Sequence, residues 1–148
     1  AQQVYLNEEN VTSYLRTEET GNMASKSSAK PQVRAALLDL QRNMAKEYDV
    51  VMDGRDIGTN VLPDAEVKIY LTASSKERAK RRYKELVEKG ETADFDKIEA
   101  DIIERDNRDM NRAIAPLKQA EDAVLVDSSD MSIAQVVDTI LTSAKNKL

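Results

Sequence analysis

Apolar residues recur along the chain at spacings that predict amphipathic helices separated by short strands. Residues 31–47 (PQVRAALLDLQRNMAKE) place apolar side chains four, three and four positions apart, behind a proline that suits the first turn of a helix. Similar patterns predict helices within 74–90, 94–113 and 132–148, and Ser132 is a candidate N-cap for the last of them.

Short runs rich in β-branched residues predict strands between these helices. The candidate strands occupy residues 50–52, 67–72 and 123–128. Strands that alternate with helices favour a parallel α/β sheet, in which ligands bind at the carboxyl ends of the strands. The segment DGRDIGT (53–59) follows the first candidate strand and therefore lies at that edge.

The DGRDIGT segment combines residues that suit a phosphorylated ligand. Its two glycines permit a sharp turn and a close approach to a ligand. Arg55 offers a fork for two phosphate oxygens, and Asp56 can accept a hydrogen bond from an amine or a hydroxyl group. Asp53 lies where phosphoryl-transfer enzymes often place a carboxylate near Mg²⁺. An exposed Arg–Asp pair of little energetic value explains the motif equally well.

The charged segment 104–112 (ERDNRDMNR) is predicted to be helical. Arg105, Asp109 and Arg112 stand at positions i, i+4 and i+7 and share one face, and Arg108 lies within one turn of them. The charge pattern alone favours a solvated face with ion pairs. The choice of arginine for these cations favours phosphate binding instead, because a guanidinium fork matches phosphate geometry.

A second arginine cluster lies on the helix predicted within 74–90. Arg78, Arg81 and Arg82 stand at i, i+3 and i+4 and again share one face, ahead of Gly90, a possible hinge. The competing interpretation is a basic outer face beside the acidic VEKGE segment (87–91).

The N-terminal part of the chain is polar. Residues 4–15 predict a strand, a turn at Asn7–Asn10, and a second strand or the start of a helix. Residues 16–30 are rich in small residues, and around Ser25 the chain can approach a planar ligand. Arg34 lies in the first turn of the next predicted helix. An ordinary loop with a surface arginine is an equally weighted interpretation.

Composition limits the chemistry that this chain can perform. The 148 residues are 41% hydrophobic and 33% charged, which is typical of one soluble globular domain. Without cysteine or histidine, disulfides, thiolate metal sites and a histidine base are excluded. The net charge of −5 disfavours binding to nucleic acid polymers. With no apolar run long enough for a membrane and no signal-peptide pattern, we expect a cytoplasmic location.

Taken together, these motifs resemble the bacterial cytidylate kinases, which transfer a phosphoryl group from ATP to CMP or dCMP. The resemblance covers nearly the whole chain, and its specificity comes from the order and spacing of several segments. They are LRT (15–17), NMASK (22–26), PQVRAALLDLQR (31–42), MDGRDIGT (52–59), LPDAEVKIYLTAS (62–74), ERAKRRYKEL (77–86), IERDNRDMNRAIAPLKQAEDA (103–123) and LVDSSDMSI (125–133).

The resemblance implies a role for each candidate residue. Ser25, Arg34 and Asp56 match positions that recognise cytosine, and Arg105 and Asp109 match positions that hold the ribose hydroxyls. Arg55 and Arg112 match positions at the phosphates, where we expect them to serve catalysis together with Asp53. The mobile lid and its phosphate contacts are expected to involve Arg78, Arg81, Arg82 and Arg108.

One departure concerns the phosphate-binding loop, G-x-x-x-x-G-K-[ST], with which such kinases begin. The 148 residues contain no such segment. We therefore expect an α/β, parallel-sheet P-loop-kinase-like core without its first strand and loop, an acceptor-binding insert and a helical lid. We also expect that a longer protein or a second polypeptide supplies the loop, and that these residues alone show marginal stability and no turnover.

This organisation divides the chain into four predicted regions. They are a monophosphate-binding segment (1–48), core strands with the DGRD loop (49–74), the lid with its flanking helices (75–116), and a core strand with the C-terminal helix (117–148). The expected partners are CMP or dCMP and ATP, with Mg²⁺ carried by ATP instead of a dedicated protein site. No nucleic acid polymer or membrane is expected to bind. The alternatives are a nucleotide-binding module without turnover and a kinase for another monophosphate such as UMP.

Overall fold

The computed structural model describes residues 3–148, in which helices predominate and strands are short. The helices are α1 (Glu18–Ser27), α2 (Pro31–Glu47), α3 (Ser75–Glu88), α4 (Phe95–Asn111) and α5 (Ile133–Lys145), with a 3₁₀ turn η1 (Thr12–Tyr14) and a π-helical turn η2 (Ile57–Val61). The strands are β1 (Tyr5–Leu6), β2 (Glu9–Asn10), β3 (Ile69–Thr72) and β4 (Val124–Asp127).

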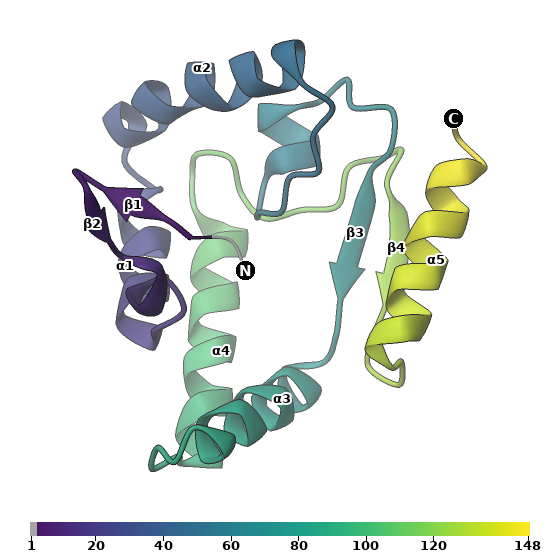
Figure 1. Cartoon of the computed structure of the whole chain (residues 1–148). Helices are drawn as coiled ribbons and strands as arrows, with labels where there is room; N and C mark the ends of the chain where they lie inside the picture. Colours follow the sequence, from purple (N-terminus) through teal and green to yellow (C-terminus); the bar gives the residue numbers. More distant parts are fainter. Residues whose placement is uncertain (1–2) are drawn as a thin grey trace.

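The strands β3 and β4 form a small parallel sheet, as the alternation of strands and helices predicts. Ile69 lies opposite Val124 and Thr72 opposite Asp127, and the chain between the two strands runs through α3 and α4. Helix α5 packs against β4 (Figure 1). In that view α1 and the β1–β2 hairpin lie on one side of α4, and the sheet and α5 lie on the other.

Several helix ends lie where the sequence predicts them. Helix α2 spans Pro31–Glu47 with its proline in the first turn. The predicted N-cap of α5, Ser132, forms a capping box with Gln135. Helix α3 ends before Gly90, whose positive φ of 76° suits the left-handed residue that commonly follows a helix. The predicted break at this glycine is therefore confirmed.

The prediction of a strand at residues 50–52 is wrong. This segment is extended without regular structure, and the side chain of Val51 is fully exposed. A strand requires a neighbouring strand to accept and donate its backbone hydrogen bonds. Within the described residues, β3 and β4 pair with each other and neither pairs with this segment.

Helix α1 lies inside the polar stretch 16–30, for which the sequence predicted no helix. The hydroxyl of Thr17 caps its first turn by accepting a hydrogen bond from the backbone of Thr20 at 3.2 Å. Glu18 and Glu19 follow in the first turn, where acidic side chains favour the helix dipole. No apolar stripe marks this helix, and its single buried residue is Ser25.

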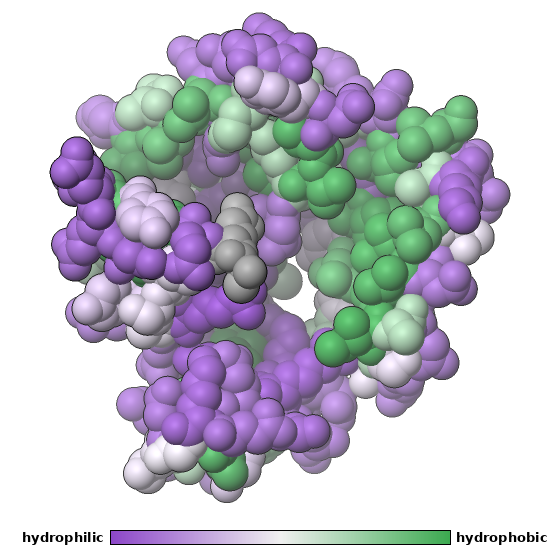
Figure 2. All heavy atoms as spheres, viewed as in Figure 1, coloured by the Kyte–Doolittle hydropathy of each residue, from purple (hydrophilic) through white to green (hydrophobic). Residues whose placement is uncertain are grey.

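Apolar burial is limited and is concentrated around the sheet and the α3–α4 pair. The rings of Tyr83 and Phe95 meet edge to face with centroids 6.2 Å apart, and Ala79 is fully buried. A broad apolar surface is exposed over the sheet and α5, whereas the visible surface over α3 is polar (Figure 2). The exposed apolar residues of these elements include Leu71, Leu125, Ile133, Val137 and Leu141. No helix of residues 3–148 is long and apolar enough to cross a membrane.

Candidate functional site

The DGRD loop is held against α2 and turns directly into η2. Arg42 of α2 donates hydrogen bonds to the carbonyl oxygens of Asn60 and Val61 at 2.9 and 3.0 Å. A Cβ atom on Gly54 would lie 2.8 Å from the side chain of Ile57, so a larger residue here would displace Ile57. These constraints direct the carboxylate of Asp56 inward, and only 8% of this residue is exposed.

The carboxylate of Asp56 lies between two arginines from distant parts of the chain. Arg34 of α2 forms an ion pair with its Oδ2 atom, and the Nη2 atom of Arg112 lies 3.2 Å from its Oδ1 atom. Arg112 is itself buried, and it also donates to Ser28 Oγ at 3.1 Å and to the Ala115 carbonyl at 2.8 Å. The fold thus brings together Arg34, Asp56 and Arg112.

A second carboxylate, Asp109 of α4, is almost completely buried at 1% exposure. Its Oδ1 atom accepts a hydrogen bond from Ser25 Oγ of α1 at 2.6 Å. The Nε atoms of Arg55 and Arg105 lie 3.4 and 3.8 Å from its Oδ2 atom. The predicted helical face of Arg105, Asp109 and Arg112 therefore meets Ser25 and the DGRD loop at one place.

Two buried polar atoms of this cluster have no hydrogen-bond partner among residues 3–148. They are Nε of Arg105, a donor, and Oδ2 of Asp109, an acceptor. Burial is the main influence that lowers the pKa of Arg105, and the neighbouring charge of Arg55 acts in the same direction. Because unpaired buried polar atoms carry a desolvation cost, this pair suits a ligand hydroxyl that donates to one atom and accepts from the other.

A cavity of about 330 Å³ brings most of the predicted site residues together. The apolar side chains of Val33, Leu37 and Ile57 form part of its wall. Its charged and polar lining includes every predicted substrate-binding and catalytic residue, namely Ser25, Arg34, Asp53, Arg55, Asp56, Arg105, Asp109 and Arg112. This combination of an apolar wall and convergent polar groups is typical of small-molecule sites.

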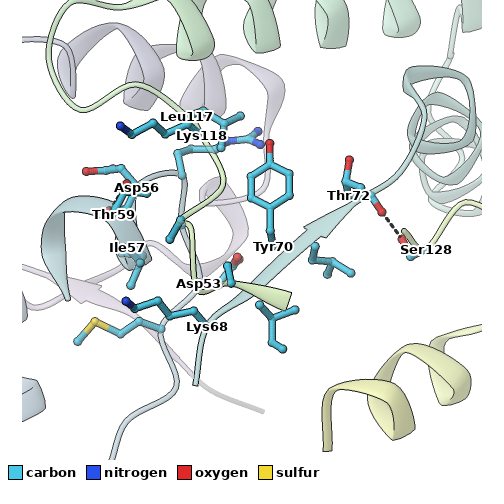
Figure 3. Close-up of a pocket in the computed structure, with 18 of the residues that line it drawn as sticks. Asp53, Asp56, Ile57, Thr59, Lys68, Tyr70, Thr72, Leu117, Lys118 and Ser128 are labelled. Atoms are coloured by element: carbon cyan, nitrogen blue, oxygen red, sulfur yellow. Dashed lines mark hydrogen bonds between the residues drawn. The ribbon is translucent and has the colours of Figure 1, made fainter. Parts of the chain in front are cut away.

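A larger cavity, of about 390 Å³, lies beside β3 and shares the DGRD loop with the first (Figure 3). Lys68 lies in its wall, with only 8% of the residue exposed, and forms an ion pair with Asp122 at 2.7 Å. The hydrogen bond from Lys68 lowers the pKa of Asp122. Arg78 and Arg81 of α3 also line this cavity.

The predicted lid arginines point in different directions. Arg78 binds Asp106, and Arg81 donates to the backbone and hydroxyl oxygens of Ser128. Arg82 instead contacts Glu85 and the carbonyl oxygen of Arg16. Their shared helical face therefore does not form one continuous cluster.

The remaining lid candidate, Arg108, is directed away from α3. Its Nε atom donates to Ser25 Oγ at 2.9 Å, and its Nη2 atom donates to Asn22 Oδ1 at 2.9 Å. Both partners belong to α1, so Arg108 connects α4 to α1.

The sequence interpretation overlooked Ser28 and Arg42, which hold the site together. Ser28 stands three residues after Ser25, and Arg42 stands eight residues after Arg34, so helical spacing places each near its predicted neighbour's face. No group of three or more His, Cys, Asp or Glu residues that could hold a metal ion occurs in the described part of the chain.

Comparisons with known proteins identify close relatives. The family model described as cytidylate kinase matches residues 1–146. The cytidylate kinase of Aeromonas salmonicida (strain A449) is 53% identical over 145 residues, which are 98% of this chain and 63% of that protein. That of Aliivibrio salmonicida (strain LFI1238) is 54% identical over 145 residues, 98% of this chain and 65% of that protein. The chain thus spans a little under two thirds of the length of these curated relatives.

Proposed function

The chain belongs to the cytidylate kinase family, and from this premise we propose that the cavity beside Asp109 binds CMP or dCMP as the phosphoryl acceptor for ATP. The observation that carries the proposal is that Arg105 Nε and Asp109 Oδ2, 3.8 Å apart in the wall of that cavity, are both buried without a hydrogen-bond partner. A sugar hydroxyl donates to the carboxylate and accepts from the guanidinium, and so satisfies both atoms at once.

Recognition of the base is assigned to Asp56, Arg34 and Ser25. Cytosine carries an exocyclic amine that can donate to a carboxylate, whereas uracil presents a carbonyl oxygen at the same position. A carboxylate facing that carbonyl loses its partner and meets a second acceptor, which disfavours UMP. Arg34 already binds Asp56, and its remaining N–H groups can donate to the ring acceptors of cytosine.

The acceptor phosphate is assigned to Arg55 and Arg112. Arg55 is partly exposed at the cavity edge, where 38% of its side chain is accessible, and Arg112 is buried beside Asp56. Phosphoryl transfer spreads negative charge over the equatorial oxygens of the moving group. Two guanidinium groups held in position before the reaction stabilise that charge with little reorganisation.

The donor phosphates are assigned to the larger cavity on the other side of the DGRD loop. Arg78 and Arg81 line that cavity, and Asp53 lines both. Mg²⁺ is commonly bound by one or two carboxylates together with substrate phosphates, so Asp53 fits an ion that arrives with ATP. The ion supplies charge neutralisation at the phosphates, while the arginines of this chain orient them.

Calorimetric titration of the chain with CMP, dCMP and UMP tests acceptor binding. We expect CMP and dCMP to bind at least about tenfold more tightly than UMP, because only cytosine pairs with Asp56. Asp39→Ala, at an exposed position of α2, is the control and should bind as the parent does. Equal binding of CMP and UMP would contradict the base assignment, and binding of neither would refute the proposal.

Phosphoryl transfer is tested by joining this chain to the residues of the Aeromonas salmonicida relative that lie outside the matched region. This chimaera, which keeps the order of segments in the relative, should form CDP from CMP and Mg–ATP. Arg112→Met in the chimaera should lower kcat more than it raises KM, since Arg112 acts on charge that develops during transfer. A folded chimaera that bound CMP without forming CDP would exclude the kinase activity.

A further inference from the structure

Arg108 connects the helix that carries Asp109 to the helix that carries Ser25. It precedes Asp109 on α4, and its guanidinium donates to Ser25 Oγ and Asn22 Oδ1 on α1, both at 2.9 Å. Its remaining contact is the exposed Glu104, at 3.4 Å. Arg108 lines neither of the two cavities, so it touches the site only through its neighbours.

Arg108 and Asp109 together fix which way the hydroxyl of Ser25 points, one as donor and the other as acceptor. A serine hydroxyl has one hydrogen to donate and two lone pairs with which to accept. Because the N–H of Arg108 occupies one acceptor position, the single hydrogen is directed to Asp109 Oδ1, 2.6 Å away. Asp109 Oδ1 is therefore occupied by Ser25, and Asp109 Oδ2 is the oxygen that lies beside Arg55 and Arg105.

Polar contacts such as these carry much of the attachment of α1 to α4. Met23 is 61% exposed, and Ser25 is the single buried residue of α1. At Gly21 the backbone of α1 comes close to the Arg105 side chain of α4, since a Cβ atom there would lie 2.9 Å from Arg105 Nη1. With little apolar area to hold the helix, the direction of a few hydrogen bonds sets its position.

We propose that Arg108 is a positioning residue, which orients Ser25 and thereby presents Asp109 Oδ2 to the sugar hydroxyls of the acceptor nucleotide. The inference rests on the proposed function and assigns Arg108 to the sugar side of the acceptor site, away from the lid. It predicts that loss of Arg108 weakens recognition of the hydroxyls specifically, beyond any general loosening of α1.

The test compares CMP with 2′,3′-dideoxy-CMP, which lacks both sugar hydroxyls, by calorimetric titration of the full chain. Arg108→Met should weaken CMP binding about tenfold, the size expected for a hydrogen bond to a charged group, and should weaken dideoxy-CMP binding by a clearly smaller factor, because that ligand retains only the base and phosphate contacts. A merely structural role would weaken both ligands by the same factor and leave their ratio as in the parent.

A double-mutant cycle tests whether Arg108 acts through Ser25. In a Ser25→Ala background, Arg108→Met should change CMP affinity by less than about twofold, because the group through which it acts is gone. Asn22→Ala retains Arg108 but removes one of its two hydrogen-bond acceptors on α1. It should therefore lower CMP affinity by less than Arg108→Met does. Glu104→Gln is the matched control and should bind as the parent does, with thermal midpoints recorded for every variant.

The outcomes separate this inference from the proposed function. If Arg108→Met and Ser25→Ala reduced CMP affinity independently, so that their factors multiplied in the double variant, Arg108 would not act through Ser25. An unchanged preference for CMP over dideoxy-CMP in Arg108→Met would also overturn the role of Arg108. Neither result would contradict the proposal that the chain binds CMP. A parent chain that bound no CMP would overturn the proposed function, and this inference with it. If Arg108→Met does not fold, Asn22→Ala decides, because an unchanged ligand preference in that variant contradicts the proposal.

Discussion

The interface between α1 and α4 is polar, whereas the interface between α5 and β4 is apolar. Across the first, Arg108, Ser25 and Asp109 are joined by directed hydrogen bonds. Across the second, the amphipathic helix α5 packs against β4, whose Val126 is buried. Directed contacts determine where individual atoms lie, and apolar contacts determine mainly how much surface leaves water. We therefore expect changes in the first interface to alter ligand binding and changes in the second to alter stability.

The largest expected effect is that of Asp109→Ala. This variant removes the carboxylate that compensates Arg55, Arg105 and Arg112, and it leaves Ser25 without its acceptor. Removing one partner of a buried ion pair typically destabilises a protein by about 3–5 kcal/mol. Urea unfolding should show a loss of that order, and calorimetry should detect no CMP binding. Parental CMP affinity in this variant would disprove the assignment of Asp109.

Asp56→Asn should remove most of the discrimination between bases. An amide can rotate to donate to uracil or to accept from cytosine, whereas the carboxylate can only accept. We expect the ratio of UMP to CMP dissociation constants to fall from at least about tenfold in the parent to near one, because the amide matches either base. Titrations with both nucleotides measure this ratio, and a ratio equal to that of the parent would exclude Asp56 from base recognition.

Val126→Ala tests the apolar side of the comparison. Only 4% of this residue is exposed, and truncation of a buried aliphatic side chain in β4 should lower the free energy of unfolding by about 2 kcal/mol. CMP affinity should remain that of the parent under conditions where the variant is folded. If Val126→Ala lowered CMP affinity without lowering the free energy of unfolding, the inference that the α5–β4 interface affects stability and the α1–α4 interface affects binding would be wrong.

Gly21→Ala should move stability and binding in opposite directions. Alanine in a helix is favoured over glycine by about 0.5–1 kcal/mol, so the thermal midpoint should rise. The added methyl group meets the end of the Arg105 side chain and displaces it from the sugar site. CMP binding should weaken by a few fold, in line with one perturbed polar contact. Tighter CMP binding would contradict the placement of Arg105.

The smallest expected effect concerns Glu18 of α1, which meets Asp101 of α4. The hydrogen bond with Asp101 is the main influence that raises the pKa of Glu18 above its usual value of 4.5, and burial adds to it. A raised pKa in the folded state means that this contact stabilises below 4.5 and is lost as pH rises through the raised value. Glu18→Gln should therefore flatten the pH dependence of unfolding between 4.5 and the raised pKa, and should be slightly more stable than the parent at neutral pH. Urea unfolding across that range measures the difference.

Several parts of the molecule could be predicted from local sequence because local interactions decide them. The bounds of α2 follow from its apolar spacing and leading proline, and the start of α5 follows from its capping box. The spacing of Arg105 and Asp109 determined that they share one face of α4, which depends only on helical geometry. Arg112, predicted on the same face, follows the end of α4 in an extended conformation and still lies 3.9 Å from Asp109. Their roles in ligand binding remain predictions.

Other parts could not be predicted in this way because their partners are distant in sequence. Residues 50–52 have the composition of a strand, yet strand pairing depends on a neighbour and not on propensity. Helix α1 has no apolar periodicity, and its position depends on α4. Its Ser25 donates to Asp109, which stands 84 residues further along the chain.

The sequence by itself determined helices α2 to α5, the parallel strands β3 and β4, and the residue types from which a phosphate-binding site can be made. The tertiary structure decided which of those residues share a cavity and which atoms stay unpaired. It also decided that Arg108 contacts α1, that Arg78 contacts Asp106 of α4 and that Arg81 contacts Ser128 after β4, although helical spacing made all of them candidates for one surface. The physical reason is that helical spacing depends on backbone geometry within a few residues, whereas the direction of a long side chain depends on the acceptors that packing brings within its reach.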